Sequence, residues 1–248
     1  MRWVVGLLAL AIGWSAAEAR SETASRGKGK IELALQYDFL PSEAAQISDG
    51  SGKKHAGRLQ NGAIVEGRNR NAIRFDGTGT IVMGDVPASL NPASRALTVG
   101  AFCQPAGPDG VLVAMGDKSN GFSLYLKAGV PHFAVRSDGR LSQAAARAPV
   151  VLNQWIHLAG ALDPQGKTLL IVNGWTVASE PGKLIAKQPA EPLNVGADLG
   201  SPVGQYAGPQ HWQGLVQDVR LYWSVLERSD RDQWQDWADL PGCGCKKN

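Results

Sequence analysis

The chain has 248 residues, of which 44% are hydrophobic and 19% charged, with 30 Gly and 14 Pro. This composition is too apolar and too weakly charged for a disordered chain. Three Cys cannot build the disulfide framework of a small secreted scaffold, so a large buried core must stabilise the fold. The length fits one β-sandwich domain, and the surplus of Gly predicts many turns between short strands.

The N-terminus has the pattern of a secretory signal peptide over residues 1–19. Arg2 provides a positive charge, residues 4–14 carry no polar side chain, and Ala17-Glu18-Ala19 fits the small-x-small cleavage pattern. The apolar run is shorter than the about 20 residues that a membrane-spanning helix needs. We therefore expect cleavage after Ala19, a secreted or periplasmic protein, and no integral membrane span after cleavage.

The net charge of +3 comes from the two ends of the chain. Residues 20–30 carry four basic residues and one acidic residue and are predicted to be a basic flexible linker, and residues 241–248 form a Cys- and Lys-containing tail. Residues 31–245 carry 18 Lys and Arg against 20 Asp and Glu, a net charge of −2. A nucleic-acid binder places basic and aromatic residues together on a folded face, so nucleic acid is not an expected partner.

Short strand-like segments follow one another from Ile31 onward. In residues 31–39 large apolar side chains occupy every second position, which places them on one face of a strand. Similar segments are residues 72–75, 80–83, 97–103, 111–115, 122–126, 133–135, 155–162, 168–172, 175–178, 193–196 and 215–223. Residues 76–79 are predicted to form a hairpin-like turn. Asn173-Gly174 gives the clearest hairpin signal, because Asn-Gly favours the positive φ angles of a type I′ turn.

One segment near the C-terminus has helical spacing. Ser229 could cap it, and Trp234, Trp237 and Ala238 recur at i, i+3 and i+4. No segment before residue 225 shows a sustained period of 3.6 residues. About a dozen short strands and a short C-terminal helix predict an all-β fold, namely a two-sheet antiparallel jelly-roll sandwich over residues 31–240.

Four stretches of the chain carry a recognisable pattern. They are Asp49-Gly-Ser-Gly with His55-Ala-Gly-Arg-Leu59, then Ala72-Ile-Arg-Phe-Asp-Gly77, then Trp155-Ile-His-Leu-Ala159 with Leu170-Ile-Val-Asn-Gly174, then Trp212-Gln-Gly-Leu-Val-Gln-Asp-Val-Arg-Leu-Tyr222. In this order they resemble the laminin-G-like jelly-roll domains of the concanavalin A-like lectin and glucanase superfamily. The structural hallmark positions of the resemblance are Phe75, Trp155, His157, Asn173, Gly174 and Gly214. The resemblance implies a sandwich that binds glycans or proteins, often with calcium at one rim.

The pair Trp155 and His157 has a catalytic and a structural interpretation. The two residues share one strand face because they are two positions apart. A catalytic interpretation would pair His157 with a carboxylate as an acid or base. The interpretation that we favour makes Trp155 a core aromatic and His157 a hydrogen-bonded inner or rim residue, since a fold by itself supplies no reaction.

The expected protein is not an enzyme. Glycoside hydrolysis needs two carboxyl groups flanking the bond, and related glucanases of this superfamily carry them as Glu-x-Asp-x-Glu on one strand. The sequence contains no such triplet, no Gly-x-Ser-x-Gly nucleophile motif and no zinc-spaced set of Cys and His. Carboxylates distant in sequence could still meet in space.

Calcium is the one cofactor that the sequence raises. It needs several oxygen ligands, often Asp carboxylates and loop carbonyls. Asp49, Asp76, Asp117 and Asp218 occupy predicted loops or strand ends and could contribute. Asp is also common in turns without any metal, so ordinary turn chemistry is the competing interpretation of each residue.

Exposed aromatic side chains are the expected ligand-binding groups. Sugar C–H surfaces pack on aromatic rings, while polar side chains bind the hydroxyl groups. Trp175 directly follows the Asn-Gly turn, so we expect part of its ring to reach solvent, in either a binding role or a hairpin-anchoring role. Tyr206, His211 and Trp223 are further binding candidates.

The three Cys leave the disulfide pattern open. Cys243 and Cys245 could form a local bridge, or one of them could pair with Cys103. Cys103 could equally be a small buried hydrophobic residue.

Taken together, the sequence predicts a secreted, non-catalytic binding module for extracellular carbohydrate or glycoprotein. One alternative is a protein-interaction or structural cell-envelope domain without sugar affinity. Another is a carbohydrate-active hydrolase whose catalytic residues no motif reveals.

Overall fold

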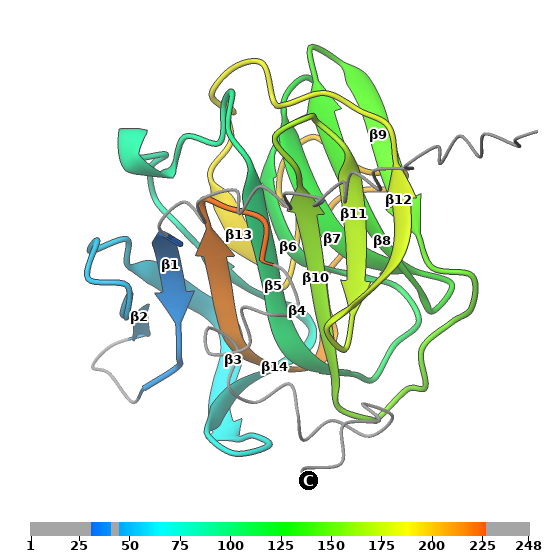
Figure 1. Cartoon of the computed structure of the whole chain (residues 1–248). Coiled ribbons are helices and arrows are strands. Elements are labelled where there is room, and N and C mark those ends of the chain that lie inside the picture. Colours follow the sequence, from blue (N-terminus) through cyan, green and yellow to red (C-terminus); the bar gives the residue numbers. More distant parts are fainter. Residues whose placement is uncertain (1–30, 41–44, 227–248) are drawn as a thin grey trace, which may run out of the picture.

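The computed structural model describes residues 31–40 and 45–226. In these residues fourteen β-strands and one 3₁₀ turn, η1 (Ala88–Leu90), fold into the predicted antiparallel jelly-roll sandwich (Figure 1). The hydrogen-bonded ladder folds over itself, so that one end of it packs against the other. The predicted signal peptide (1–19), the basic linker (20–30), the helix at Ser229–Ala238 and the tail (241–248) lie outside the described residues.

The first layer of the sandwich is built from five neighbouring strands. In spatial order they are β12 (Trp175–Glu180), β11 (Thr168–Val172), β10 (Ile156–Leu162), β5 (Leu97–Pro105) and β14 (Gln213–Tyr222). On its other side β14 pairs with β1 (Leu33–Tyr37) along its C-terminal half and with β4 (Asn71–Val82) along its N-terminal half. All of these pairings are antiparallel.

The second layer continues from β4. Its strands are β13 (Leu193–Val195), β6 (Gly110–Gly116), β7 (Gly121–Lys127), β8 (Val130–Ser137) and β9 (Arg140–Ala145). At its outer side β3 (Gly57–Glu66) pairs with β4, and β2 (Gln46–Ile47) pairs with β3. Strands β8 and β9 face β11 and β12 across the sandwich, which closes the two layers over a common core.

Strand β4 corrects the predicted hairpin at residues 76–79. The chain does not reverse there but runs as one strand from Asn71 to Val82. Its first half pairs with β14 and its last residues pair with β13, so β4 belongs to both layers. Gly77, with a φ of +95°, lies where the strand changes partner. Asp-Gly-Thr-Gly therefore marks a corner in a strand, where Gly tolerates the bend.

Strand β1 departs from the predicted alternation because its register shifts between Leu33 and Leu35. An irregularity of this kind moves the residues before it to the other face of the sheet. Ile31 and Leu33 pack beside Phe102 and Tyr222 on the outer face. Leu35 and Tyr37 instead lie in the central core.

The core between the layers consists of large side chains from both sheets. Phe75, Phe122, Phe133 and Trp212 are each at most 1% exposed and belong to one cluster. The packing is tight enough that a Cβ placed on Gly160 of β10 would lie 2.0 Å from Cδ2 of Phe133 on β8. The Phe133 ring therefore rests directly on the backbone of the opposite sheet.

The β11–β12 connection has the predicted hairpin geometry. Asn173 and Gly174 have φ values of +49° and +78°, and Val172 pairs with Trp175 across the turn. Two successive positive φ angles are what a type I′ turn requires. Within the described part of the chain, no helix is long and apolar enough to cross a membrane.

Candidate functional site

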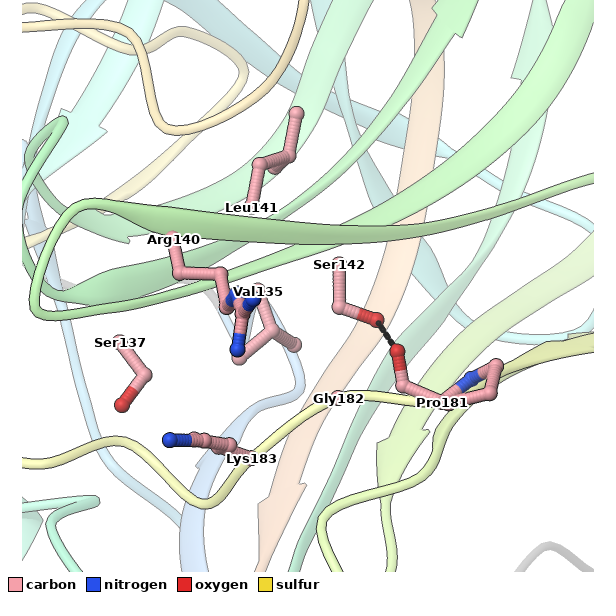
Figure 2. Close-up of a pocket in the computed structure, with 8 residues that line it drawn as sticks. All are labelled: Val135, Ser137, Arg140, Leu141, Ser142, Pro181, Gly182 and Lys183. Atoms are coloured by element: carbon pink, nitrogen blue, oxygen red, sulfur yellow. Dashed lines mark hydrogen bonds between the residues drawn. The ribbon is translucent and has the colours of Figure 1, made fainter.

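A pocket of about 250 Å³ lies at the rim of the sandwich, where the β8–β9 hairpin meets the segment that leaves β12 (Figure 2). The hairpin contributes five of the lining residues and the segment contributes three. They are Val135, Ser137, Arg140, Leu141 and Ser142 from the hairpin, and Pro181, Gly182 and Lys183 from the segment. The pocket is therefore formed by chain segments about 40 residues apart in sequence.

Two serine side chains fix the walls of this pocket. Ser142 Oγ donates a hydrogen bond to the carbonyl oxygen of Pro181 at 2.9 Å, and Ser137 Oγ donates one to the carbonyl oxygen of Leu184 at 2.8 Å. These bonds satisfy two backbone acceptors that no strand partner reaches. They hold the segment against the inner side of β8 and β9.

The close approach at the pocket requires glycine at position 182. A Cβ on Gly182 would lie 2.8 Å from the Cβ and from the Oγ of Ser142, and equally close to the carbonyl oxygen of Gly166. Any larger residue would push the segment away from the β8–β9 hairpin. Gly182 thus sets the width of the pocket.

The pocket carries positive charge. Arg140 follows the Asp138-Gly139 turn of the hairpin, and Lys183 lies across from it, with the charged ends of both side chains directed into the same space. None of the eight lining residues is acidic. The nearby Asp138 carboxylate forms an ion pair with Lys187 at 3.4 Å on the exposed side of the turn. The pocket therefore offers two cations, fixed hydroxyl groups and the apolar side chain of Val135, whereas the side chain of Leu141 packs on the outer face of the layer.

Tyr206, one of the predicted ligand-binding residues, lies in a packed cluster on the outer face of the second layer. Its ring meets that of Tyr125 edge-on at 4.6 Å, and the Tyr125 ring stacks on His132 at 4.9 Å. The Tyr206 hydroxyl donates a short hydrogen bond to Oδ2 of Asp198. Burial raises the pKa of Tyr206 above its usual value, and the neighbouring Asp198 charge adds to that effect.

Asp198 is a buried carboxylate, only 1% exposed, and its role is to hold the loop before β14. Burial raises its pKa, while the hydrogen bond from Tyr206 acts in the opposite direction. Glu191 lies close enough to raise the same pKa slightly, and its carboxylate accepts from the backbone N–H of Ser201. The two carboxylates thus bind loop donors rather than facing the pocket, whose lining includes neither.

Trp175 is exposed at the start of the edge strand β12, with 49% of its surface accessible. It lies at one end of β12, and the pocket segment begins at Pro181, just beyond the other end. At about 3.3 Å per residue the two positions are about 20 Å apart. Trp175 and the pocket are therefore separate surface features along one edge of the first layer.

His211 and Trp223 lie at opposite ends of β14. Nδ1 of His211 is 3.2 Å from the carbonyl oxygen of Gly79. Trp223 donates from Nε1 to the carbonyl oxygen of Ser89 at 3.3 Å, and the guanidinium of Arg95 lies over its ring at 4.9 Å from the centroid. The structure does not bring Trp175, Tyr206, His211 and Trp223 into one site.

Two of the hallmark residues, His157 and Asn173, are joined by two hydrogen bonds that involve their backbones. The backbone N–H of His157 donates to Oδ1 of Asn173, and the backbone N–H of Asn173 donates to the carbonyl oxygen of His157. This reciprocal clamp fixes the β11–β12 turn to the start of β10. The His157 ring is fully buried against Phe102, and burial, together with the charge of Arg220, holds its pKa well below the usual value.

The other hallmark positions lie in packed surroundings. Phe75 is in the central core, and Trp155 packs on the outer cluster around Phe102. Gly214 has a φ of +127°, and a Cβ there would lie 2.2 Å from the carbonyl oxygen of Gln104. Only glycine fits this approach between β14 and β5.

The carboxylates of the predicted calcium residues are engaged by protein donors. Asp49 accepts from the backbone N–H groups of Gln36, Ser51 and His55 and from the Ser51 hydroxyl. Although partial burial acts to raise it, these donors lower the pKa of Asp49. An oxygen pair that accepts four hydrogen bonds has little remaining capacity for a cation.

The remaining three candidates do not fit calcium better. Asp76 and Asp117 accept from the backbone N–H groups two residues ahead of them, as in Asx turns. Asp218 is buried and pairs with Arg220 at 2.6 Å and with Arg70 at 3.6 Å. Within residues 31–40 and 45–226 no three His, Cys, Asp or Glu side chains gather into a metal-binding group. Calcium binding stays a prediction, which titration tests.

Cys103 is a free thiol in the central core, fully buried on β5. Burial raises the pKa of this thiol. Its surroundings are those of a small hydrophobic residue. Cys243 and Cys245 lie outside the described residues, so a bridge between them stays a prediction.

Arg140 and Lys183, the two cations of the pocket, have no sequence motif. The one signal in the sequence is Asp138-Gly139, a dipeptide that favours type I′ turns and whose φ values are +47° and +79°. It predicts the hairpin that presents Arg140. The position of Lys183 depends on contacts across more than 40 residues of sequence, which no local pattern encodes.

The fold of the chain is that of the antiparallel jelly-roll sandwiches. The chain belongs to the concanavalin A-like lectin/glucanases superfamily, whose family model matches residues 75–230. This finding confirms the predicted resemblance to laminin-G-like domains. No curated protein matches the chain.

Solved structures with the same fold include binding domains. The binding domain of Paraclostridial Mosquitocidal Protein 1 superposes with a TM-score of 0.64 at 17% identity, over 82% of this chain and 51% of that one. Domain 4 of AbnA, a GH43 extracellular arabinanase from Geobacillus stearothermophilus in complex with arabinotriose, gives 0.63 at 18% identity, over 81% and 96%. The botulinum neurotoxin serotype G binding domain gives 0.58 at 8% identity, over 82% and 51%. The chain spans about half the length of the two toxin binding domains.

Proposed function

We propose that this chain is a secreted, non-catalytic binding module whose ligand is an extracellular carbohydrate or glycoprotein. The observation that carries the proposal is the rim pocket of Figure 2, a preformed hollow with hydroxyl, cationic and apolar groups on a rigid sandwich. Concave sites with a few fixed polar groups are typical of small-ligand binding. The similar fold of an arabinanase domain in complex with arabinotriose supports the same class of ligand.

The chemistry of the pocket supports binding rather than hydrolysis. Glycoside cleavage needs two carboxyl groups on opposite sides of the scissile bond. The eight residues that line the pocket include no carboxylate, and Asp198 and Glu191 are engaged by the loop that they hold. The pocket thus lacks the carboxyl pair of a glycoside hydrolase, which supports binding of a sugar without cleavage.

The exposed indole of Trp175 supports a second contact with the ligand. An aromatic face in solvent lowers its free energy by packing against the C–H surface of a sugar. We expect Trp175→Ala to weaken retention on polysaccharide by about tenfold, the equivalent of about 1.4 kcal/mol. Val151→Ala, which truncates another exposed apolar side chain, is the matched control.

Affinity electrophoresis against a panel of immobilised polysaccharides tests the proposal, with melting temperature measured for each variant. Retention of the native protein that falls with Trp175→Ala and persists with Val151→Ala supports it. If Trp175→Ala lowers the melting temperature and leaves retention intact, Trp175 anchors the hairpin only. Absence of any retention, confirmed on a glycan array, would favour a protein-interaction or structural envelope domain. Release of reducing sugar from the same polymers would identify a hydrolase.

Secretion has its own test. N-terminal sequencing of the protein recovered from outside the cytoplasm should begin at Arg20, the residue after the predicted cleavage site. Recovery of the full chain in the cytoplasm would contradict the secreted assignment without affecting the binding proposal.

A further inference from the structure

The rim pocket is more positive than the domain that contains it. Arg140 and Lys183 line it, and no acidic residue does. Yet residues 31–245 carry a net charge of −2. An anion attracted to this protein would therefore be attracted by the pocket and not by the charge of the domain as a whole.

The two cations stand on fixed supports. Arg140 begins β9, directly after the tight turn at Asp138-Gly139, and Lys183 follows Gly182, where the segment passes close to Ser142. The hydroxyls of Ser137 and Ser142 tie that segment to the hairpin on either side. Because the backbone is already held, binding costs little conformational entropy beyond the ordering of the two side chains.

Neither cation is committed to the nearest acidic side chain. Asp138 is the closest carboxylate in sequence to Arg140, and it pairs with Lys187 on the exposed side of the turn. Asp163, in the neighbouring β10–β11 turn, accepts from the backbone N–H groups of Gln165 and Lys167. Asp138 and Asp163 thus have partners other than the two pocket cations.

We propose that the pocket binds the anionic substituent of an acidic polysaccharide, a uronate carboxylate or a sulfate ester; this rests on the proposed function. The guanidinium of Arg140 can bind two oxygens of such a group at once, and the ammonium of Lys183 adds a second positive charge. A volume of about 250 Å³ is below the range of about 300–1,000 Å³ that holds drug-sized ligands, so we expect the pocket to hold a single sugar unit with its substituent.

The test compares polymers that differ only in charge. Polygalacturonate and its fully methyl-esterified form present the same backbone with and without carboxylates, and dextran sulfate and dextran do the same for sulfate. The variant R140Q/K183Q removes both pocket cations. The control R74Q/R147Q removes two exposed positive charges, Arg74 on β4 and Arg147 beyond the end of β9, that do not line the pocket.

The native protein should bind the charged polymer at least about tenfold more tightly than its neutral form, and NaCl should weaken that binding because exposed charges are screened. R140Q/K183Q should lose this preference, with an unchanged melting temperature, while R74Q/R147Q keeps it. Preference for polygalacturonate alone identifies a carboxylate as the ligand group, and preference for dextran sulfate alone identifies a sulfate.

Three results would overturn the inference. Equal affinity for charged and neutral polymers would show that the protein does not recognise the anionic group, although it still binds glycans. Equal losses in the two double variants would mean a diffuse effect of charge. Absence of binding to every polymer would refute the proposed function itself. Should R140Q/K183Q fail to fold, the single variants R140Q and K183Q, each with its melting temperature, decide whether the pocket carries the preference for the charged polymer.

Discussion

Gly160→Ala tests the packing of one sheet on the other at its tightest point. Gly160 lies on β10, and the Phe133 ring of β8 rests on its Cα. A methyl group there would lie 2.0, 2.1 and 2.4 Å from three carbons of that ring. Carbon atoms pack at about 3.5–4.0 Å, so the ring or the strand must move by about 1.5 Å.

The cost of that movement is large because both residues are in the closed core. Overpacking a well-filled core costs about 1–3 kcal/mol, and we expect the upper half of that range, about 2–3 kcal/mol. In a domain of about 200 residues, 1 kcal/mol corresponds to about 2–4 °C in melting temperature. Gly160→Ala should therefore melt about 4–12 °C below the native protein.

Urea denaturation followed by tryptophan fluorescence measures the change. Gly84→Ala is the control, since nothing lies within 4 Å of a Cβ at that exposed position, and it should change the unfolding free energy by less than about 0.5 kcal/mol. Adding Phe133→Leu should recover part of the loss, so that the double variant is more stable than the two single effects predict. A Gly160→Ala protein as stable as the native one would refute the stacking of β10 on β8.

Three further predictions concern charge and metal. Tyr206→Phe removes the donor to the buried Asp198 carboxylate and should cost about 1.5–3 kcal/mol at neutral pH. Because burial raises the pKa of Asp198, the cost should fall as acid protonates this carboxyl group; urea denaturation over a series of pH values checks this, and a loss that does not change with pH contradicts it. The pKa of His157 is lowered in the folded state, so as the pH falls the unfolded chain takes up a proton at this residue before the folded chain does. The free energy of unfolding should therefore fall as the pH drops below about 6.5, the ordinary pKa of His, and His157→Phe should make the free energy of unfolding depend less on pH in this range. Calcium titration by calorimetry, with melting curves, should show no heat and no shift at the Asp49 loop, because the Asp49 carboxylate already accepts four hydrogen bonds; heat or a rise in melting temperature would show that calcium binds.

Most strands can be predicted from the sequence because they bury apolar side chains on at least one face. The strands that bury few such side chains cannot. Strands such as β5, β6 and β7 are apolar on their inner faces, and their predicted bounds differ from the observed ones by at most two residues at either end. Strand β3 is mostly exposed and β9 carries small and polar residues, so neither shows a hydrophobic period. The corner in β4 looked like a hairpin because Asp-Gly-Thr-Gly serves both purposes. The residues of such a segment favour a bend, but they do not determine whether the chain turns back as a hairpin or continues as one strand.

The candidate site was less predictable for a different reason. The sequence favoured exposed aromatic residues, and Trp175 is indeed exposed on β12, but the pocket depends on residues without a motif. Ser137 and Ser142 matter through bonds to backbone carbonyls more than 35 residues away. Lys183 becomes a pocket residue only because Gly182 lets its segment approach the hairpin. Long-range contacts of small side chains leave no periodic signal.

The most direct test of the binding account is nuclear magnetic resonance of the ¹⁵N-labelled domain titrated with a short polygalacturonate oligomer. We predict that amide shifts change with saturation in residues 135–142 and 181–183, around the pocket cations, and that the methyl-esterified oligomer leaves them in place. Shifts confined to the opposite face, or no shift at millimolar oligomer, would contradict the pocket as the binding site.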